Sequence, residues 1–228
     1  MTAEPTAREA VLGAVRASLA AARAAETTPE ASAPEAGGEP AAADGPGDRT
    51  ERIETFRDVL SRVGGRVLRA LDEEHAGVLL AQLAGRLGAR SVALSDAPRV
   101  ARLAERLGPE VTTFRGWDDR ARLLAADLGV SEAQGGIAET GTLVLDSADE
   151  RHRLVSLVPP VHLALLPASR LRGTLGEALG AACSAHPELA GRALTLITGP
   201  SRTADIELTL VVGVHGPEQL YVIVLEDA

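Results

Sequence analysis

The hydrophobic and polar positions between residues 51 and 128 alternate between two patterns. Helical spacing of apolar residues, as in Ile53, Phe56 and Leu60, predicts helices over residues 51–63, 72–87, 97–107 and 118–128. Short apolar or β-branched runs between them predict strands over residues 66–69, 91–94 and 111–113. Ser95 and Asp96 are expected to cap the helix over 97–107. This alternation is typical of crossover units, so it predicts an α/β fold with a mainly parallel sheet flanked by helices.

The pattern changes after residue 129. Residues 129–166 contain the pair Gly135-Gly136, apolar runs over 141–145 and 154–157, and a polar turn between them, without helical spacing. These features predict an antiparallel hairpin insertion. After it we expect a fully buried strand over 161–166, a helix over 174–185, and strands over 194–197, 208–214 and 221–225.

The first 50 residues differ from the rest of the chain. Residues 6–25 carry apolar side chains near helical spacing in an alanine-rich background, so an N-terminal helix is predicted within residues 1–25. Residues 26–50 are rich in Ala, Pro, Gly, Glu and Thr, which predicts a flexible linker. Residues 51–228 are then expected to form one α/β domain. Two alternatives stay open for the first helix: packing on this domain or docking on a partner.

Composition excludes several classes of function. The formal net charge of −9 and the aromatic content of 2% argue against nucleic-acid binding, which needs a basic face and stacking side chains. All 23 positions counted as lysine or arginine hold arginine, so the chain has no lysine for a Schiff base or a P-loop. No apolar run approaches the roughly 20 residues of a membrane span, and no apolar leader is present, which predicts a cytoplasmic protein.

Metal and cluster chemistry is not expected within this chain. Cys183 is the single cysteine, so the chain forms no internal disulfide and cannot by itself ligate an iron–sulfur cluster through thiolates. Its position in the middle of a predicted helix favours a buried, inert thiol. The five histidines lack the spacing of a zinc site.

The first candidate ligand-binding stretch covers residues 135–142. Its glycines allow close approach of the backbone, Glu139 offers a carboxylate, and two threonines offer hydroxyl groups. We consider Glu139 as a general base or a carboxylate nucleophile, by analogy with acyl-transfer enzymes of related fold. The alternatives are a tight hairpin turn with a solvated acid, or a carboxylate that orients Arg202 in an ion pair.

The second candidate stretch covers residues 198–207 and follows the strand over 194–197. We expect it to open a short helix at Ala204-Asp205 at the carboxyl edge of the sheet, where α/β proteins bind ligands. The planar fork of Arg202 suits a carboxylate or a phosphate, so the loop is a candidate anion cradle. A surface ion pair between Arg202 and Glu207 or Asp205 is the alternative. His162, after Pro159-Pro160, is considered both as a proton shuttle and as a hydrogen-bonded core residue.

Three motifs in this order, residues 135–142, 157–162 and 198–207, resemble the LUD family, and most nearly its lactate utilization protein C type. The resemblance covers about residues 51–228. It implies a cytosolic bacterial protein that acts in the oxidation of L-lactate to pyruvate beside iron–sulfur partner proteins. It also implies a fold similar to the sugar-phosphate isomerase and CoA-transferase group, known as NagB/RpiA-like.

Three functions remain open at this point. The first is a component of L-lactate utilization that binds a small carboxylate, a phosphate-containing ligand or a partner at the Glu139 and Arg202 loops, with iron–sulfur clusters only in the partners. The second is a stand-alone enzyme acting on a phosphorylated or CoA-linked substrate, and the third is a non-catalytic assembly subunit. The candidate catalytic residue is Glu139, and the predicted ligand-binding residues are Gly135, Gly136, Thr140, Gly141, Thr142, His162, Gly199, Ser201, Arg202, Thr203 and Asp205.

Overall fold

The computed structural model describes residues 46–116, 119–147, 153–186, 193–204, 210–213 and 215–226. The predicted N-terminal helix and residues 26–45 of the predicted linker lie outside these residues. The first described helix, α2, covers Pro46–Arg62.

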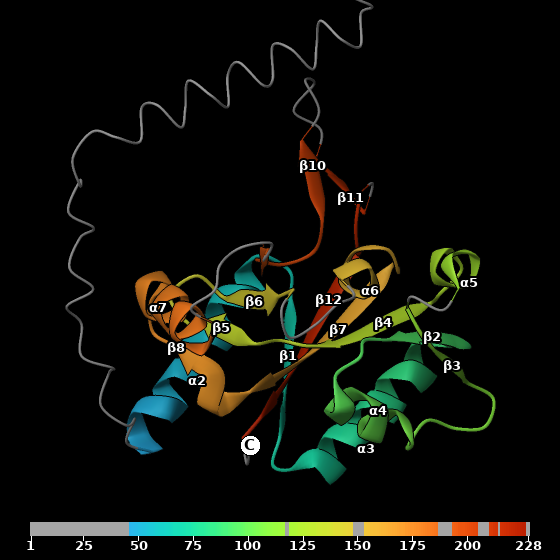
Figure 1. Ribbon diagram of the computed structural model, residues 1–228, viewed down its shortest axis with the longest axis horizontal. Helices are drawn as coiled ribbons and strands as arrows, with labels where there is room; N and C mark the ends of the chain where they lie inside the picture. The colour runs from blue at the N-terminus through green and yellow to red at the C-terminus, as the bar shows by residue number, and fades with distance from the viewer. Residues whose placement is uncertain are drawn as a thin grey trace, which may run out of the picture. The chain divides into compact units, whose positions relative to one another are not determined.

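Within the described residues, six parallel strands form the central sheet (Figure 1). Every neighbouring pair in this sheet is parallel. The predicted α/β fold with a mainly parallel sheet is therefore confirmed. Across the sheet the strands are β1 (Arg66–Ala70), β12 (Gln219–Leu225), β7 (Val161–Pro167), β4 (Leu128–Glu132), β2 (Ser91–Leu94) and β3 (Thr112–Arg115).

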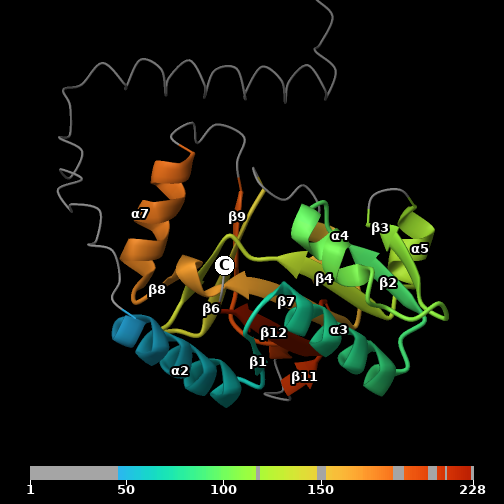
Figure 2. The same ribbon diagram turned by 90° about the horizontal axis from the view of Figure 1, so that it is seen from below.

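Two helices cover one face of this sheet, α3 (Glu73–Leu87) and α4 (Pro98–Ala104) (Figure 2). The carboxylate of Asp72 caps α3 by accepting a hydrogen bond from the amide of His75 at 2.7 Å. Every second residue of the central strands points toward these helices, as the alternation of a β-strand requires. The shared core includes Leu80, Leu83, Val130, Leu163 and Ile223, all at most 1% exposed.

Helix α2 and a second sheet pack on the opposite face. In that sheet β6 runs antiparallel to both β5 and β9, whereas β5 and β8 are parallel. Phe56 and Leu60 of α2 share a core with Leu143 of β6 and Leu166 of β7. The predicted antiparallel insertion is therefore confirmed, and it forms a second layer on the central sheet. The strands of this layer are, in order, β8 (Leu171–Arg172), β5 (Gly135–Ile137), β6 (Thr142–Asp146) and β9 (Leu194–Ile197).

The remaining elements complete the two layers. Helix α7 packs on β5 and β8 of the second sheet, and the two-stranded β10–β11 ribbon projects from the sheets (Figure 1). Among the helices of the described residues, none combines the length and the hydropathy that a membrane span requires. The bounds are α5 (Arg120–Leu124), α6 (Arg153–Leu157), the 3-10 turn η1 (Ala168–Arg170), α7 (Leu175–Ala185), β10 (Arg202–Ala204) and β11 (Leu210–Val212).

Two assignments between residues 118 and 157 were wrong. The helix expected to reach residue 128 ends at Leu124, and Leu128–Glu132 is the strand β4, fully buried between β2 and β7. The run over 154–157 was expected to be a strand but lies in helix α6, which buries Val155 and leaves Leu154 and Leu157 exposed. Short apolar runs fit a buried strand and a helical turn equally well, and only packing against the sheet separates them.

Two local predictions at helix starts were also wrong. The N-cap of α4 is Ala97, without a side-chain hydrogen bond, because the amide of Ser95 still pairs with the carbonyl of Val130 at 3.0 Å and continues the sheet. The short helix expected at Ala204 is instead the end of strand β10, paired with β11. The segment after β9 therefore enters an antiparallel ribbon, and no helix begins at Ala204.

Candidate functional site

The two polar loops identified in the sequence meet at a pair of threonines. The hydroxyl oxygens of Thr142 and Thr198 lie 2.7 Å apart, and the hydroxyl of Thr140 donates to that of Thr142 at 2.8 Å. Because β6 and β9 are antiparallel neighbours, with Leu143 opposite Ile197, these threonines occupy the next facing position. The loops therefore share one rim of the second sheet.

Glu139 contacts the start of helix α7. Its exposed carboxylate accepts a hydrogen bond from the amide of Leu175 at 2.8 Å, and its own amide donates to the carbonyl of Gly173 at 3.1 Å. A carboxylate at a helix start is favoured by the helix dipole and by the unpaired amides of the first turn. Glu139 thus has a structural partner that neither alternative from the sequence anticipated.

Arg202 contacts the end of a different helix. Its Nη2 donates to the carbonyl of Val63, directly after α2, at 2.5 Å. Gly199, at φ +92°, packs on the same Val63, and the amide of Ser201 donates to the carbonyl of Pro217 at 2.8 Å. Thr203 lies in β10, and Asp205 lies outside the described residues. A shared anion between Glu139 and Arg202 stays a prediction.

The glycines of the first loop serve close packing. A Cβ on Gly136 would lie 2.8 Å from a methyl of Leu166, and Gly135 precedes it in strand β5. Gly141 has φ +61°, and a Cβ there would lie 2.6 Å from the backbone nitrogen of Leu60. The left-handed conformation and the contact with α2 together require glycine at position 141.

His162 is completely buried and shares a hydrogen bond of 2.8 Å between its Nε2 and the hydroxyl of Ser131. Burial lowers the pKa of His162 to about 3, so the imidazole is neutral near pH 7. Its Nδ1 has no hydrogen-bond partner in the described structure. Without access to solvent, the pair has the character of a core polar contact.

A cluster of charges that the sequence reasoning missed lies at the carboxyl end of β4. Glu132, with a side chain 9% exposed, pairs with Arg99 of α4 at 2.9 Å and with Arg170 of η1 at 3.0 Å. Arg99 also reaches Glu73 of α3 at 2.8 Å. Hydrogen bonds from Arg102 and then from Arg99 lower the pKa of Glu73 to about 2. After β2 the chain continues to α4 on one face of the central sheet, and after β4 it continues to the second sheet on the other face. α/β proteins bind ligands at such a point, where two neighbouring strands lead to opposite faces.

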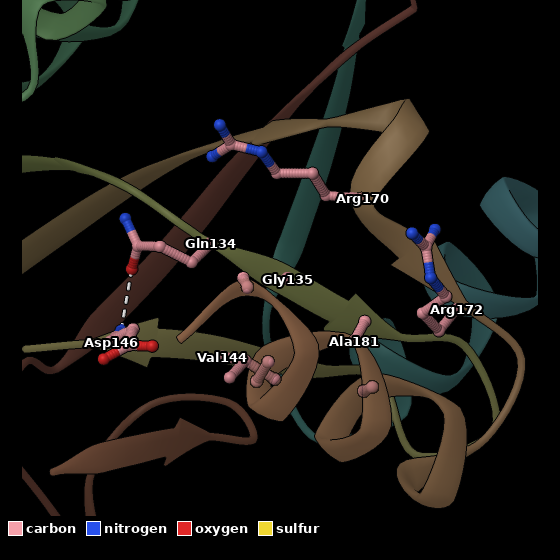
Figure 3. A pocket seen from close by; sticks show the side chains of 10 residues that line it. Gln134, Gly135, Val144, Asp146, Arg170, Arg172 and Ala181 are labelled. Atoms are coloured by element: carbon pink, nitrogen blue, oxygen red, sulfur yellow. Dashed lines mark hydrogen bonds between the residues drawn. The ribbon is translucent and has the colours of Figure 1, made fainter. Parts of the chain in front are cut away.

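A cavity of about 260 Å³ lies on the other side of Arg170, between the second sheet and α7 (Figure 3). Gln134 and Asp146 lie at one end and Arg172 at the other, with Arg170 along the side (Figure 3). The Gln134 side chain connects the two regions, because its amide nitrogen donates to the carbonyl of Glu132 at 2.8 Å. Small residues of α7 line the helical side, namely Ala178, Ala181, Ala182 and Ala185.

The sequence contained a partial signal for this region. Had Leu128–Glu132 been recognised as a strand, Glu132 would have stood at its carboxyl end, the position that favours function. Arg170 and Arg172 carried no comparable signal, because their place depends on the fold of the second sheet. The prediction of a buried Cys183 was wrong, since this thiol is exposed on α7 while Ala178 of the same helix is buried.

Comparison with known proteins identifies the family. The LUD domain matches residues 53–225. The chain therefore belongs to the LUD domain family. A crystal structure of a DUF162 family protein from Deinococcus radiodurans superposes with a TM-score of 0.59 at 26% identity, over 78% of this chain and 98% of that one.

Several curated relatives of this LUD protein are named Lactate utilization protein C. The one from Geobacillus thermodenitrificans is 32% identical over 192 residues, which cover 77% of this chain and 78% of that protein. The one from Bacillus licheniformis is 37% identical over 133 residues, 55% of each chain. Some alignments are shorter than the one with the Geobacillus thermodenitrificans protein. In these, the chain spans about half the length of its relative.

Proposed function

We propose that this LUD protein is a component of L-lactate utilization that acts, in the bacterial cytoplasm, in the oxidation of L-lactate to pyruvate. The observation that carries the proposal is its alignment, over more than three quarters of the chain, with a protein named Lactate utilization protein C. The partners in this proposal are iron–sulfur proteins. With the single cysteine Cys183, a thiolate-ligated cluster would belong to them.

The rim formed by the Glu139 and Arg202 loops is the proposed contact for an anionic ligand or for a partner. Its support is geometric, because the Thr142–Thr198 hydrogen bond joins the loops and Arg202 is exposed. Among the described residues, Arg202 donates only to a backbone carbonyl. The other N–H groups of its guanidinium can therefore bind a carboxylate or a phosphate.

Deletion of the gene tests the pathway assignment. We expect the deletion strain to lose growth on L-lactate as sole carbon source, to grow normally on pyruvate, and to recover with a plasmid copy. An affinity-tagged copy should purify together with iron–sulfur proteins. Normal growth of the deletion strain on L-lactate would contradict the proposal.

Two variants in the complemented strain test the rim. Arg202→Ala and Glu139→Gln are expected to reduce growth on L-lactate while the protein level is unchanged. Glu177→Gln is the matched control, because Glu177 also accepts a backbone hydrogen bond beside the start of α7, from Gly173 at 2.9 Å. Growth of all three variants on L-lactate at the wild-type rate would show that the rim is not used. An equal loss in Glu139→Gln and Glu177→Gln would reduce Glu139 to a structural role.

A further inference from the structure

We propose that strand β9 pairs edge to edge with β9 of a second copy of this chain. The second sheet has the strand order β8-β5-β6-β9, so β9 forms one of its edges. Among the described residues, β9 pairs with β6 on one side and with no strand on the other. The proposal concerns self-association and does not depend on the proposed role in L-lactate utilization.

The outer side of β9 carries backbone groups without a partner. The amide of Ser147 in the β6 segment donates to the carbonyl of Ala193 at 3.1 Å, and the direction of these bonds alternates along an antiparallel strand. The carbonyl of Val144, which lies opposite Leu196, instead accepts from the amide of Gln134 on the far side of β6 at 2.9 Å. The N–H and C=O groups of Leu196 therefore point away from β6, where no described residue pairs with them. Such a free edge is a template for another strand.

The other edge strands of the two larger sheets are protected against pairing, whereas β9 is not. Charged side chains and very short strands are the usual means of protecting an edge. Strand β1 carries Arg66 and Arg69, β3 ends at Arg115, and β8 is only two residues long and ends at Arg172. Strand β9 has four residues and no charge, and the side chain of Leu196 is 47% exposed. The unprotected edge therefore indicates an interaction surface.

The uncharged sequence of β9 suits a second copy of itself. In an antiparallel pair around a twofold axis, residues near the axis lie beside their own copies, so a charged strand would place like charges opposite each other. Self-pairing of β1 would bring its arginines together, whereas β9 offers only leucine, threonine and isoleucine. With the axis at Leu196, the outward N–H and C=O groups of one copy bond to those of the other. The result is a continuous sheet with four strands from each copy.

Self-pairing would also cover the exposed side chain of Leu196. Leu194 lies on the same face of β9 and already packs against the buried cluster that contains Val144 and Ala178. Leu196 lacks such cover, and its copy across the axis would supply it. A contact of four residues from each copy is smaller than the roughly 800 Å² per partner of a typical stable interface. We therefore expect a dimer whose population rises with protein concentration.

Analytical ultracentrifugation of the full-length protein from about 1 to about 500 µM tests the proposal. We expect the wild type to change from monomer to dimer over this range. Leu196→Lys and Leu196→Glu should each weaken dimerisation by about tenfold or more, because each places like charges across the axis. Leu124→Lys is the matched control, since Leu124 is 69% exposed on α5, outside the second sheet, and this variant should dimerise within about twofold of the wild type. Circular dichroism and thermal unfolding verify that the variants fold.

An equimolar mixture of Leu196→Lys and Leu196→Glu separates self-pairing from any other use of this edge. Opposite charges then face each other across the axis, so the mixture should associate within about threefold of the wild type and give the mixed dimer in native mass spectrometry. The proposal would be overturned by a wild type that stays monomeric over the whole range, by Leu196→Lys dimerising as tightly as the wild type, or by a mixture that stays monomeric. None of these results bears on growth on L-lactate, so the two proposals fail independently.

Discussion

The hydroxyl groups of Thr142 and Thr198 share a hydrogen bond of 2.7 Å although 56 positions separate them in the chain. This contact closes the end of the β6–β9 pair and joins the two loops that carry most of the predicted site residues. The sequence alone gave the proximity of these two loops only as a hypothesis, and the Thr142–Thr198 hydrogen bond joins them directly.

The contribution of this threonine pair is measurable in a double-mutant cycle. Thr142→Val should lower the free energy of unfolding by about 1 kcal/mol, because Thr142 is 4% exposed and loses a buried hydrogen bond. Thr198→Val should cost less alone, since Thr198 is exposed and water replaces its partner. Urea unfolding of the two single variants and the double variant should give a coupling of about 0.5–1 kcal/mol. Strict additivity would show that the loops are held together by other contacts.

Gly141 is predicted to be intolerant of a side chain. Gly141→Ala should lower the free energy of unfolding by about 2–4 kcal/mol, because it combines a left-handed backbone with a clash against the backbone of Leu60. Gly85→Ala is the control: Gly85 is an exposed residue of α3 with open space around its Cβ position, and alanine there should stabilise by about 0.5–1 kcal/mol. Thermal unfolding of both variants checks the opposite signs. A neutral Gly141→Ala would mean that the loop does not pack on α2.

Glu132 is predicted to stabilise the carboxyl edge of the sheet. Glu132→Gln should destabilise the fold by about 2 kcal/mol, because it leaves Arg99 and Arg170 beside a neutral group in a largely buried position. Arg106→Gln breaks an exposed pair with Glu74 and should cost less than about 1 kcal/mol. Chemical unfolding at low and high salt compares them. If the two variants lose equal stability, the Glu132 cluster is no more than an ordinary surface network.

Stability should fall in acid through His162. The folded pKa of about 3 lies below the ordinary value of 6.5, so between these pH values the unfolded chain binds a proton that the folded protein does not. The free energy of unfolding therefore decreases as the pH falls from 6.5 toward 3, by up to about 1.4 kcal/mol per pH unit from this residue. In urea unfolding between pH 7 and pH 4, the free energy of unfolding of His162→Leu should decrease less steeply than that of the wild type. The two slopes should differ by up to about 1.4 kcal/mol per pH unit. Parallel curves for the wild type and the variant would contradict a buried neutral imidazole.

Local sequence patterns determined the class of the fold and much of its element order. The helical face of Ile53, Phe56 and Leu60 and the apolar run over Val161–Pro167 both appear where they were expected, because the spacing of apolar residues is a property of the local chain. The antiparallel insertion was also predicted from its glycines and its lack of helical spacing. The family resemblance rested on the same local motifs, and the LUD domain match confirms it.

Only the tertiary structure decided the partners of each side chain. Leu128–Glu132 is a strand because β2 and β7 pair with it on both sides, and that pairing placed Glu132 between Arg99 and Arg170. The cavity brings together residues from 134 to 185, and Glu139 and Arg202 each contact a helix end that their own sequence neighbourhood does not specify. Such contacts form between segments far apart in the chain, so the spacing of residues within one segment cannot determine them.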